Sequence, residues 1–164
     1  LSINFQLQSN NFLINYFIYV NMKIDKNQTG IACEHFAAAE LFRLGYDVTM
    51  TSGKTKSVDI TVIKDDKAIA IQVKGMHSPK KSINWNIDKD KIKDRILYIL
   101  INLNADNLDL TPEFFILTSE EVKQLFINKT KSGNLLKRAY LSYSKIRGNK
   151  LYQNNWKKIE DSLL

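Results

Sequence analysis

The chain has 164 residues, of which 44% are apolar and 25% are charged. This composition can supply one domain with a buried core, and it excludes a disordered chain, which combines low hydrophobicity with high charge. Lysine and arginine number 24 against 17 aspartates and glutamates, giving a formal net charge of +7. A basic surface favours a polyanionic partner such as nucleic acid, although a Lys-, Asn- and Ile-rich composition also arises in AT-rich genomes.

Cysteine and histidine are scarce. Cys33 is the single cysteine, which excludes an intrachain disulfide and a cysteine-based metal cluster. With two histidines in the chain, a metal site would consist mainly of carboxylate, carbonyl and water oxygens. Such a site favours Mg²⁺ or Mn²⁺ over Zn²⁺. We expect a cytoplasmic protein.

The N-terminal region contains an apolar run over residues 12–20. The run is shorter than the roughly 20 residues of a membrane span and has no preceding basic region, so no membrane partner is expected. Met22 opens a segment that reads as an ordinary protein start. We therefore expect residues 1–21 to be an extension and residues 22–164 to form one domain. An added strand or helix in 1–21 is the alternative.

The first half of that domain predicts a helix, a strand and a β-hairpin. Thr29 can cap a mostly buried helix that ends at Gly45, and residues 46–50 read as a strand. Residues 57–74 alternate on either side of a turn centred between Asp65 and Asp66. The predicted core face carries Val58, Ile60, Val62, Ile69, Ile71 and Val73. The opposite face then carries Asp59 directly across from Gln72, with Lys74 two residues on.

The second half predicts two more strands and two helices. The strands are residues 96–103 and 113–118, the first helix is capped by Ser119 and runs to about Phe126, and the last residues form a terminal amphipathic helix. Residues 75–94 are polar and turn-rich, and residues 129–150 carry seven cations and no acid. This order predicts an α/β protein of the α+β type, in which helices flank a central mixed sheet.

The hairpin places metal-ligating and cationic groups together. Phosphodiester hydrolysis uses a divalent cation to polarise the phosphate and lower the pKa of water, and a second cation to offset the developing charge. Asp59 and the Gln72 amide can ligate a metal, and Lys74 supplies an ammonium. The Val73 backbone carbonyl lies between Gln72 and Lys74, and Glu34 on the first helix can reach the same site.

These residues resemble the motif of the PD-(D/E)XK nuclease superfamily, which has the restriction-endonuclease-like fold. The motif positions are Glu34, then S-V-D ending at Asp59, then Q-V-K from Gln72 to Lys74. Gln72 replaces the usual second acid, as in the Mrr-type restriction endonuclease variant. The run from Gln28 to Leu164 is also similar to a family of small uncharacterised bacterial proteins with a D…QxK motif. The resemblance implies a Mg²⁺- or Mn²⁺-dependent nuclease.

Simpler interpretations of the same residues remain open. Asp59 and Lys74 could form a surface salt bridge, Gln72 could be a solvated strand residue, and Glu34 could occupy an exposed helix position. Cys33 is expected to be a small buried residue, and Trp85 and Trp156 are expected in the core. The basic stretch 129–150 could be a solvated segment, although Tyr140 and Tyr143 within it favour nucleic acid.

The leading hypothesis is a Mg²⁺-dependent nuclease acting on DNA. Asp59, Gln72 and Glu34 would serve as ligands together with Val73, Lys74 would act on water, and the DNA backbone would contact Lys137, Arg138, Lys145 and Arg147. The alternatives are a catalytically inactive nucleic-acid-binding or partner-binding domain and a hydrolase of a smaller phosphate ester. A homodimer stays an open alternative to a monomer.

Overall fold

A computed structural model describes residues 24–51, 58–78, 84–87, 92–107, 109–129, 133 and 135–164, with the backbone alone for 127–129 and 135–139. The expectation for residues 1–21 lies outside these residues. The elements in chain order are α2 (Lys26–Arg43), β1 (Asp47–Met50), β2 (Ile60–Lys64), β3 (Lys67–Met76), β4 (Asn84–Asn86), β5 (Ile96–Asn102), β6 (Glu113–Thr118), α3 (Ser119–Leu125), β7 (Ile127–Lys129), β8 (Leu135–Ser142), α4 (Tyr143–Ile146) and α5 (Lys157–Leu163).

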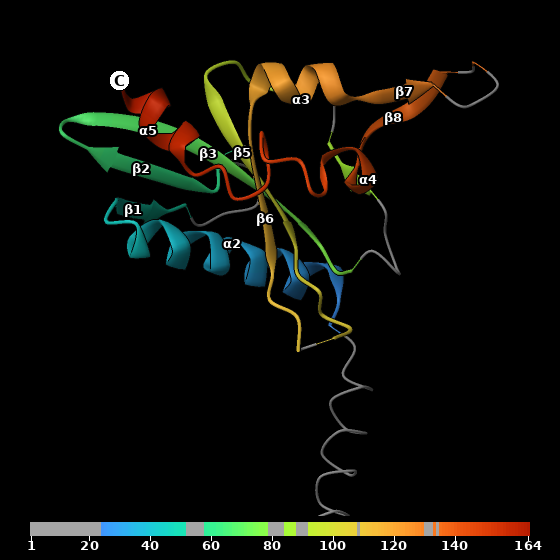
Figure 1. Cartoon of the computed structure of the whole chain (residues 1–164), viewed down its shortest axis with the longest axis horizontal. Helices are drawn as coiled ribbons and strands as arrows, with labels where there is room; N and C mark the ends of the chain where they lie inside the picture. The colour runs from blue at the N-terminus through green and yellow to red at the C-terminus, as the bar shows by residue number, and fades with distance from the viewer. Residues whose placement is uncertain are drawn as a thin grey trace, which may run out of the picture.

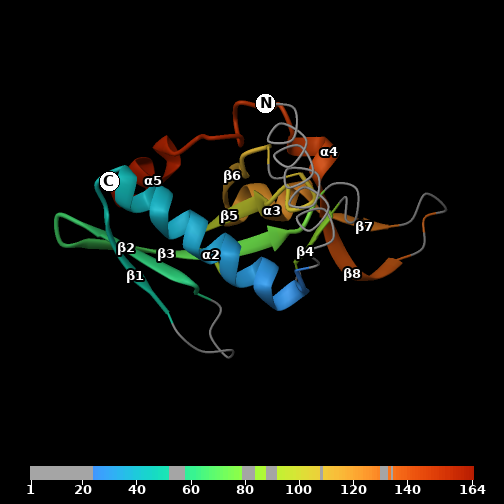
Figure 2. The same cartoon turned by 90° about the horizontal axis from the view of Figure 1, so that it is seen from below.

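A five-stranded mixed sheet forms the centre of the molecule, as predicted. Its strand order is β1-β2-β3-β5-β6, in which β3 and β5 are parallel and the other neighbours are antiparallel. Helix α2 lies along one face of this sheet and α3 lies on the other (Figure 1). A second sheet of order β4-β8-β7 stands beside the first, and the β7–β8 hairpin extends away from it (Figure 2).

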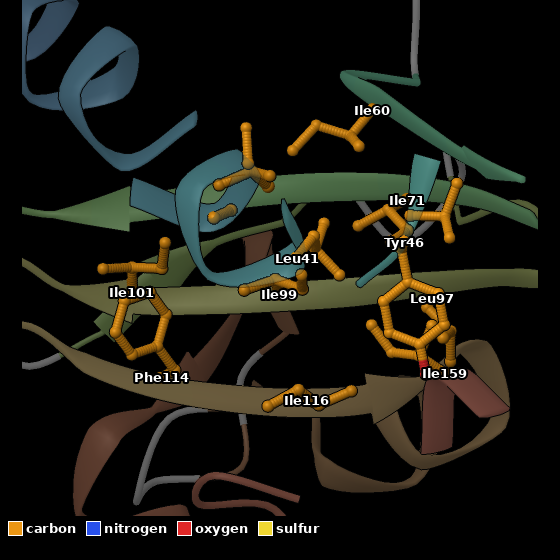
Figure 3. Packing of buried hydrophobic residues seen from close by; sticks show 14 of the residues in the cluster. Leu41, Tyr46, Ile60, Ile71, Leu97, Ile99, Ile101, Phe114, Ile116 and Ile159 are labelled. Carbon is orange, nitrogen blue, oxygen red and sulfur yellow. The ribbon is translucent and has the colours of Figure 1, made fainter. Parts of the chain in front are cut away.

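Two hydrophobic clusters pack on the two faces of the central sheet. On the α2 side, Ile60, Ile71, Ile99 and Ile116 belong to a cluster that also includes residues of α2 and of the C-terminal α5 (Figure 3). On the other side, Trp85 and Phe115 pack with residues of β5, β8, α3 and α4. All seven residues of β5 are buried, because this strand has neighbours on both edges and helices over both faces.

Helix α2 begins earlier than predicted and exposes part of its apolar content. Its N-cap is Asp25, whose carboxylate accepts a hydrogen bond from the Gln28 N–H, with the Gln28 side chain bonded back to the Asp25 N–H. Thr29 is therefore inside the helix, and its hydroxyl donates to the Asp25 carbonyl. The helix ends at Arg43, and Gly45 just beyond it has a φ of 86°, which is the left-handed conformation expected there. Phe36 and Phe42 are exposed, so the expectation of a mostly buried helix was wrong.

The second half contains strands that the sequence analysis did not predict. Strand β4 forms inside the stretch expected to be turn-rich, and β8 forms inside the basic stretch. Helix α3 is capped by Thr118 rather than Ser119. Strands β5 and β6 and the terminal helix α5 match their predictions to within a few residues. Among the described residues, no helix is long and apolar enough to cross a membrane.

Candidate functional site

The β2–β3 hairpin has the predicted register. Its pairs run from Lys64–Lys67 to Ile60–Ile71, and the turn residues Asp65 and Asp66 have φ values of 49° and 61°. Positive φ at both central residues is typical of a two-residue hairpin turn. The core face predicted for the hairpin is buried, except that Val58 is only half-buried.

Strand β3 is longer than its partner, which leaves part of its edge open. The last β2–β3 pair on this side is Ile60–Ile71, whereas β3 continues to Met76 and stays paired with β5. The N–H and C=O of a strand residue point to the same side, and alternate residues point to opposite neighbours. The Val73 N–H and C=O therefore point to the side where β2 has ended.

Asp59 occupies this open edge. Its backbone N–H donates to the Ile71 carbonyl over 2.9 Å, and its carbonyl accepts from the Thr51 N–H over 2.9 Å. Its Oδ2 accepts a hydrogen bond from the Val73 N–H over 2.7 Å. Asp59 precedes β2 rather than pairing with Gln72 across the ladder, so its carboxylate lies against the edge of β3. This corrects the prediction that Asp59 and Gln72 form a cross-strand pair.

Glu34 approaches the same place from α2. Its side chain is half-buried, and burial is the largest cause that raises the pKa of its carboxyl. The negative charge of Asp59 raises this pKa further, while His35 and then Lys74 lower it. Cys33, which precedes Glu34, packs closely against Gly75, which follows Lys74. The sequence neighbours of Glu34 and Lys74 are therefore in contact, and Glu34 is a candidate member of the same site.

Gln72 and Lys74 are half-buried residues of β3 on either side of Val73. They face away from the α2 core, because the alternate residues Ile71 and Val73 are buried within it. Among the ion pairs between described residues, none joins Asp59 to Lys74, so the simple salt-bridge interpretation was wrong. The structure joins Asp59 to Val73 by a hydrogen bond, and Glu34, Gln72 and Lys74 remain the other candidate residues of the site.

The donor atoms of this site suit a hard divalent cation. Asp59 and Glu34 supply two mutually repelling carboxylates, and Gln72 and the Val73 carbonyl supply neutral oxygens. Oxygen ligands of these kinds are the ones that Mg²⁺ and Mn²⁺ prefer. Within the described part of the chain, no three His, Cys, Asp or Glu side chains come together as a metal cluster. A metal here would therefore be held by two acids and neutral oxygens.

The predicted nucleic-acid contacts lie on the second sheet and beyond it. Lys137 and Arg138 fall on β8, where the side chains lie outside the described residues. Lys145 on α4 and Arg147 after it are exposed, and the Arg147 guanidinium lies 5.5 Å from the centre of the Tyr143 ring. Tyr143 itself is buried and donates to Glu113 Oε2 over 2.5 Å, so it cannot stack on a base.

Trp85 and Trp156 belong to the core side of the molecule, as expected. Trp85 is 1% exposed and donates from its indole to the Ile101 carbonyl, and the partly buried Trp156 packs against Phe114. Two features escaped the sequence analysis. One is the Asp59–Val73 hydrogen bond. The other is the close packing of Cys33, the neighbour of Glu34 in sequence, against Gly75, the neighbour of Lys74.

Comparison with known proteins gives a likeness of fold. No family model matches the chain, and no curated protein sequence matches it. A solved structure, that of the bacterial homing endonuclease I-Ssp6803I, superposes with a TM-score of 0.56 at 14% sequence identity. The match covers 86% of this chain and 95% of the other. This chain therefore shares the overall fold of that structure.

Proposed function

We propose that this protein is a divalent-metal-dependent nuclease that hydrolyses phosphodiester bonds in DNA. The observation that carries the proposal is the hydrogen bond that fixes the Asp59 carboxylate to the Val73 N–H where β2 ends beside β3, on the strand that also carries Lys74. The likeness to a homing endonuclease supports it at the level of fold. The arrangement also supports the PD-(D/E)XK interpretation, with Glu34 and Asp59 as acids, Gln72 at the variant position and Lys74 as the cation.

Each residue has a distinct role in this proposal. Asp59, Glu34, Gln72 and the Val73 carbonyl would hold a Mg²⁺ or Mn²⁺ ion. When bound, such an ion polarises the scissile phosphate and lowers the pKa of water. The Lys74 ammonium orients the attacking water and offsets negative charge on the phosphate. The Asp59 carboxylate is preorganised for its role because the Val73 N–H already fixes one of its oxygens.

DNA is the proposed substrate because of the basic residues beyond the central sheet. Lys145 and Arg147 are exposed on and after α4, and Lys137 and Arg138 lie on the extended β8 (Figures 1 and 2). Cations placed in this way bind the phosphate backbone and carry no sequence information. A smaller phosphate ester would make no use of them.

One observation favours a second candidate, a binding domain without activity. Gln72 stands where a further carboxylate would strengthen metal binding, which leaves two acids at the site. A domain with this defect would still bind nucleic acid through its basic residues. Binding without cleavage separates this candidate from the nuclease.

The test is a plasmid-nicking assay at low salt with Mg²⁺ or Mn²⁺. The native protein is expected to convert supercoiled DNA to nicked or linear forms and to stop when the metal is chelated. Lys74→Ala should lower the rate by about 100- to 1000-fold, as losing one electrostatic contact to the transition state does. Lys67→Ala on the same strand is the matched control and should retain native activity, because Lys67 is exposed and bonded to the chain terminus.

Two outcomes would contradict the nuclease. Equal activity in Lys74→Ala and the native protein would place the cleavage elsewhere, or in a contaminant. No cleavage of supercoiled, branched or single-stranded DNA, together with tight binding, would establish the inactive binding domain.

A further inference from the structure

Helix α2 and the central sheet approach each other closely at Gly75 of β3. A Cβ atom built on Gly75 would lie 2.6 Å from Cys33 Sγ, 3.1 Å from Cys33 Cβ and 3.2 Å from the Thr29 carbonyl oxygen. The φ of Gly75 is outside the left-handed region, so its backbone conformation does not require glycine. Glycine is needed here for space alone.

This contact joins the neighbours of two site residues. Cys33 precedes Glu34 on α2, and Gly75 follows Lys74 on β3. Cys33 is fully buried against the sheet. Burial, and after it the charge of Asp59, raises the pKa of the Glu34 carboxyl on the next residue. Because a helix moves as a rigid body, any displacement of α2 at Cys33 moves Glu34 by a similar amount.

We propose that Gly75 is a positioning residue, whose missing side chain lets α2 approach β3 until Glu34 reaches the Asp59–Lys74 group. The assignment rests on the proposed function, because it concerns the same metal site. It also explains how a site with Gln72 can hold a cation. The second carboxylate comes from α2, and it arrives only if the helix sits close to the strand.

A merely structural role for Gly75 makes a different prediction. A residue that only fills the core changes stability, and the metal affinity of the folded protein stays the same. A positioning residue changes the metal affinity of protein that is still fully folded. A misplacement of about 1 Å in a site can cost on the order of a hundredfold in rate.

The experiment measures Mn²⁺ affinity by calorimetry and plasmid nicking, well below the melting temperature of each variant. Gly75→Ala is expected to weaken Mn²⁺ binding by about 10-fold or more and to lower cleavage by about 100-fold. Adding Cys33→Ala removes the sulfur that the new methyl group meets. The double variant should therefore recover most of the Mn²⁺ affinity and most of the cleavage rate. Ile116→Ala lowers stability from the same core cluster at the far edge of the sheet and should leave Mn²⁺ affinity unchanged.

The outcomes separate this inference from the proposed function. Native protein that binds no Mn²⁺ overturns the metal site and the positioning role together. Native binding with equal affinity in folded Gly75→Ala overturns the positioning role alone. Should Gly75→Ala fail to fold, the double variant is compared with Cys33→Ala. The new methyl group still meets the Cβ of residue 33 and the Thr29 carbonyl, so the double variant is expected to bind Mn²⁺ more weakly than Cys33→Ala, by a smaller factor than Gly75→Ala loses. Equal affinities in the double variant and Cys33→Ala overturn the inference.

Discussion

The Asp59 carboxylate accepts the hydrogen bond that the Val73 N–H would otherwise donate to a neighbouring strand. Oδ2 of Asp59 lies 2.7 Å from the Val73 nitrogen, at the point where β2 no longer pairs with β3. The hydrogen bond satisfies a backbone donor of β3 and fixes the orientation of the carboxylate. One oxygen is thus engaged in structure while the other stays available for a ligand. Asp59 is therefore both a structural and a candidate functional residue.

Two substitutions of Asp59 separate these roles. Asp59→Asn keeps an oxygen that can accept from Val73, so its free energy of unfolding should stay within about 1 kcal/mol of the native value while Mn²⁺ binding and cleavage are lost. Asp59→Ala leaves the Val73 N–H without its partner and should cost about 1–3 kcal/mol in addition to the lost activity. Urea denaturation and calorimetry measure the two effects. Retained Mn²⁺ binding in Asp59→Asn would contradict the role of the charge.

The burial of Glu34, together with the charge of Asp59, predicts a pH effect on stability in the absence of metal. The Glu34 pKa is raised above its ordinary 4.5 in the folded protein, so the folded state binds more protons than the unfolded state just above that pH. Stability from Glu34 therefore falls as the pH rises through this window. Glu34→Gln has no carboxyl to titrate at this position. The free energy of unfolding of Glu34→Gln, minus that of the native protein, should therefore increase as the pH rises from about 4 to 7.

Urea denaturation at several pH values, with divalent ions chelated, measures this difference. Glu120→Gln, which removes an exposed acid from α3, corrects for the loss of one carboxylate. A constant difference between Glu34→Gln and the native protein across the range would show that burial and Asp59 do not raise the pKa of Glu34 in the folded protein.

Local patterns in the sequence predicted the hairpin well. Alternation over residues 57–74 and two turn aspartates specify the register, because a slip of one residue would expose the whole core face. The same alternation could not place Asp59, whose position depends on where β2 ends relative to β3. The start of α2 was missed because Thr29 and Asp25 are both good N-caps, and the Gln28 side chain decides between them.

Features that depend on tertiary packing were beyond the sequence analysis. The contact of Cys33 with Gly75 joins residues 42 positions apart (75 − 33). No local sequence pattern predicts that these two residues pack together. Strand β8 lies in a stretch whose cations indicated a solvated segment, but its Leu141 packs with Trp85 of β4 in the core. Tyr143 was a candidate for contact with nucleic acid, but its side chain is buried and its hydroxyl donates to Glu113.

A half-buried lysine contributes to the attachment of the C-terminal helix, beside the core contacts of Ile159 and Leu163. Lys158 Nζ donates to both carboxylate oxygens of Glu121, at 2.7 and 2.6 Å, and to the Ile116 carbonyl, and its side chain is 13% exposed. Lys158→Met keeps the length of the side chain and leaves the Glu121 charge without its partner, so we expect a loss of about 1–3 kcal/mol in urea denaturation.

Lys157→Met is the matched control for this prediction. Lys157 is 80% exposed and contacts Asp161 at 4.0 Å, and an exposed pair of this kind contributes less than about 1 kcal/mol. Equal losses in the two variants would show that the Lys158–Glu121 pair does not anchor α5.

DNA binding should depend steeply on salt through the basic residues of the second sheet and α4. Replacing Lys137, Arg138, Lys145 and Arg147 with Gln removes four charges, so the slope of log affinity against log salt should fall by up to about 3.6. Base preference should not change, because phosphate contacts do not read sequence. Fluorescence anisotropy over a salt series measures the slope. A control variant loses four other exposed cations, Lys26, Lys64, Lys67 and Lys157, and should retain most of the native slope.

A last substitution tests the variant position of the motif directly. Gln72→Glu adds a third carboxylate beside Asp59 and Glu34, so metal-free protein should lose stability through charge repulsion. A cation relieves that repulsion, and Mn²⁺ should therefore raise the melting temperature of the variant more than that of the native protein. Cleavage should be preserved or increased. Gln124→Glu adds the same charge at an exposed position of α3 and should show the native response to Mn²⁺. Equal responses in Gln72→Glu and Gln124→Glu would place the metal away from Gln72.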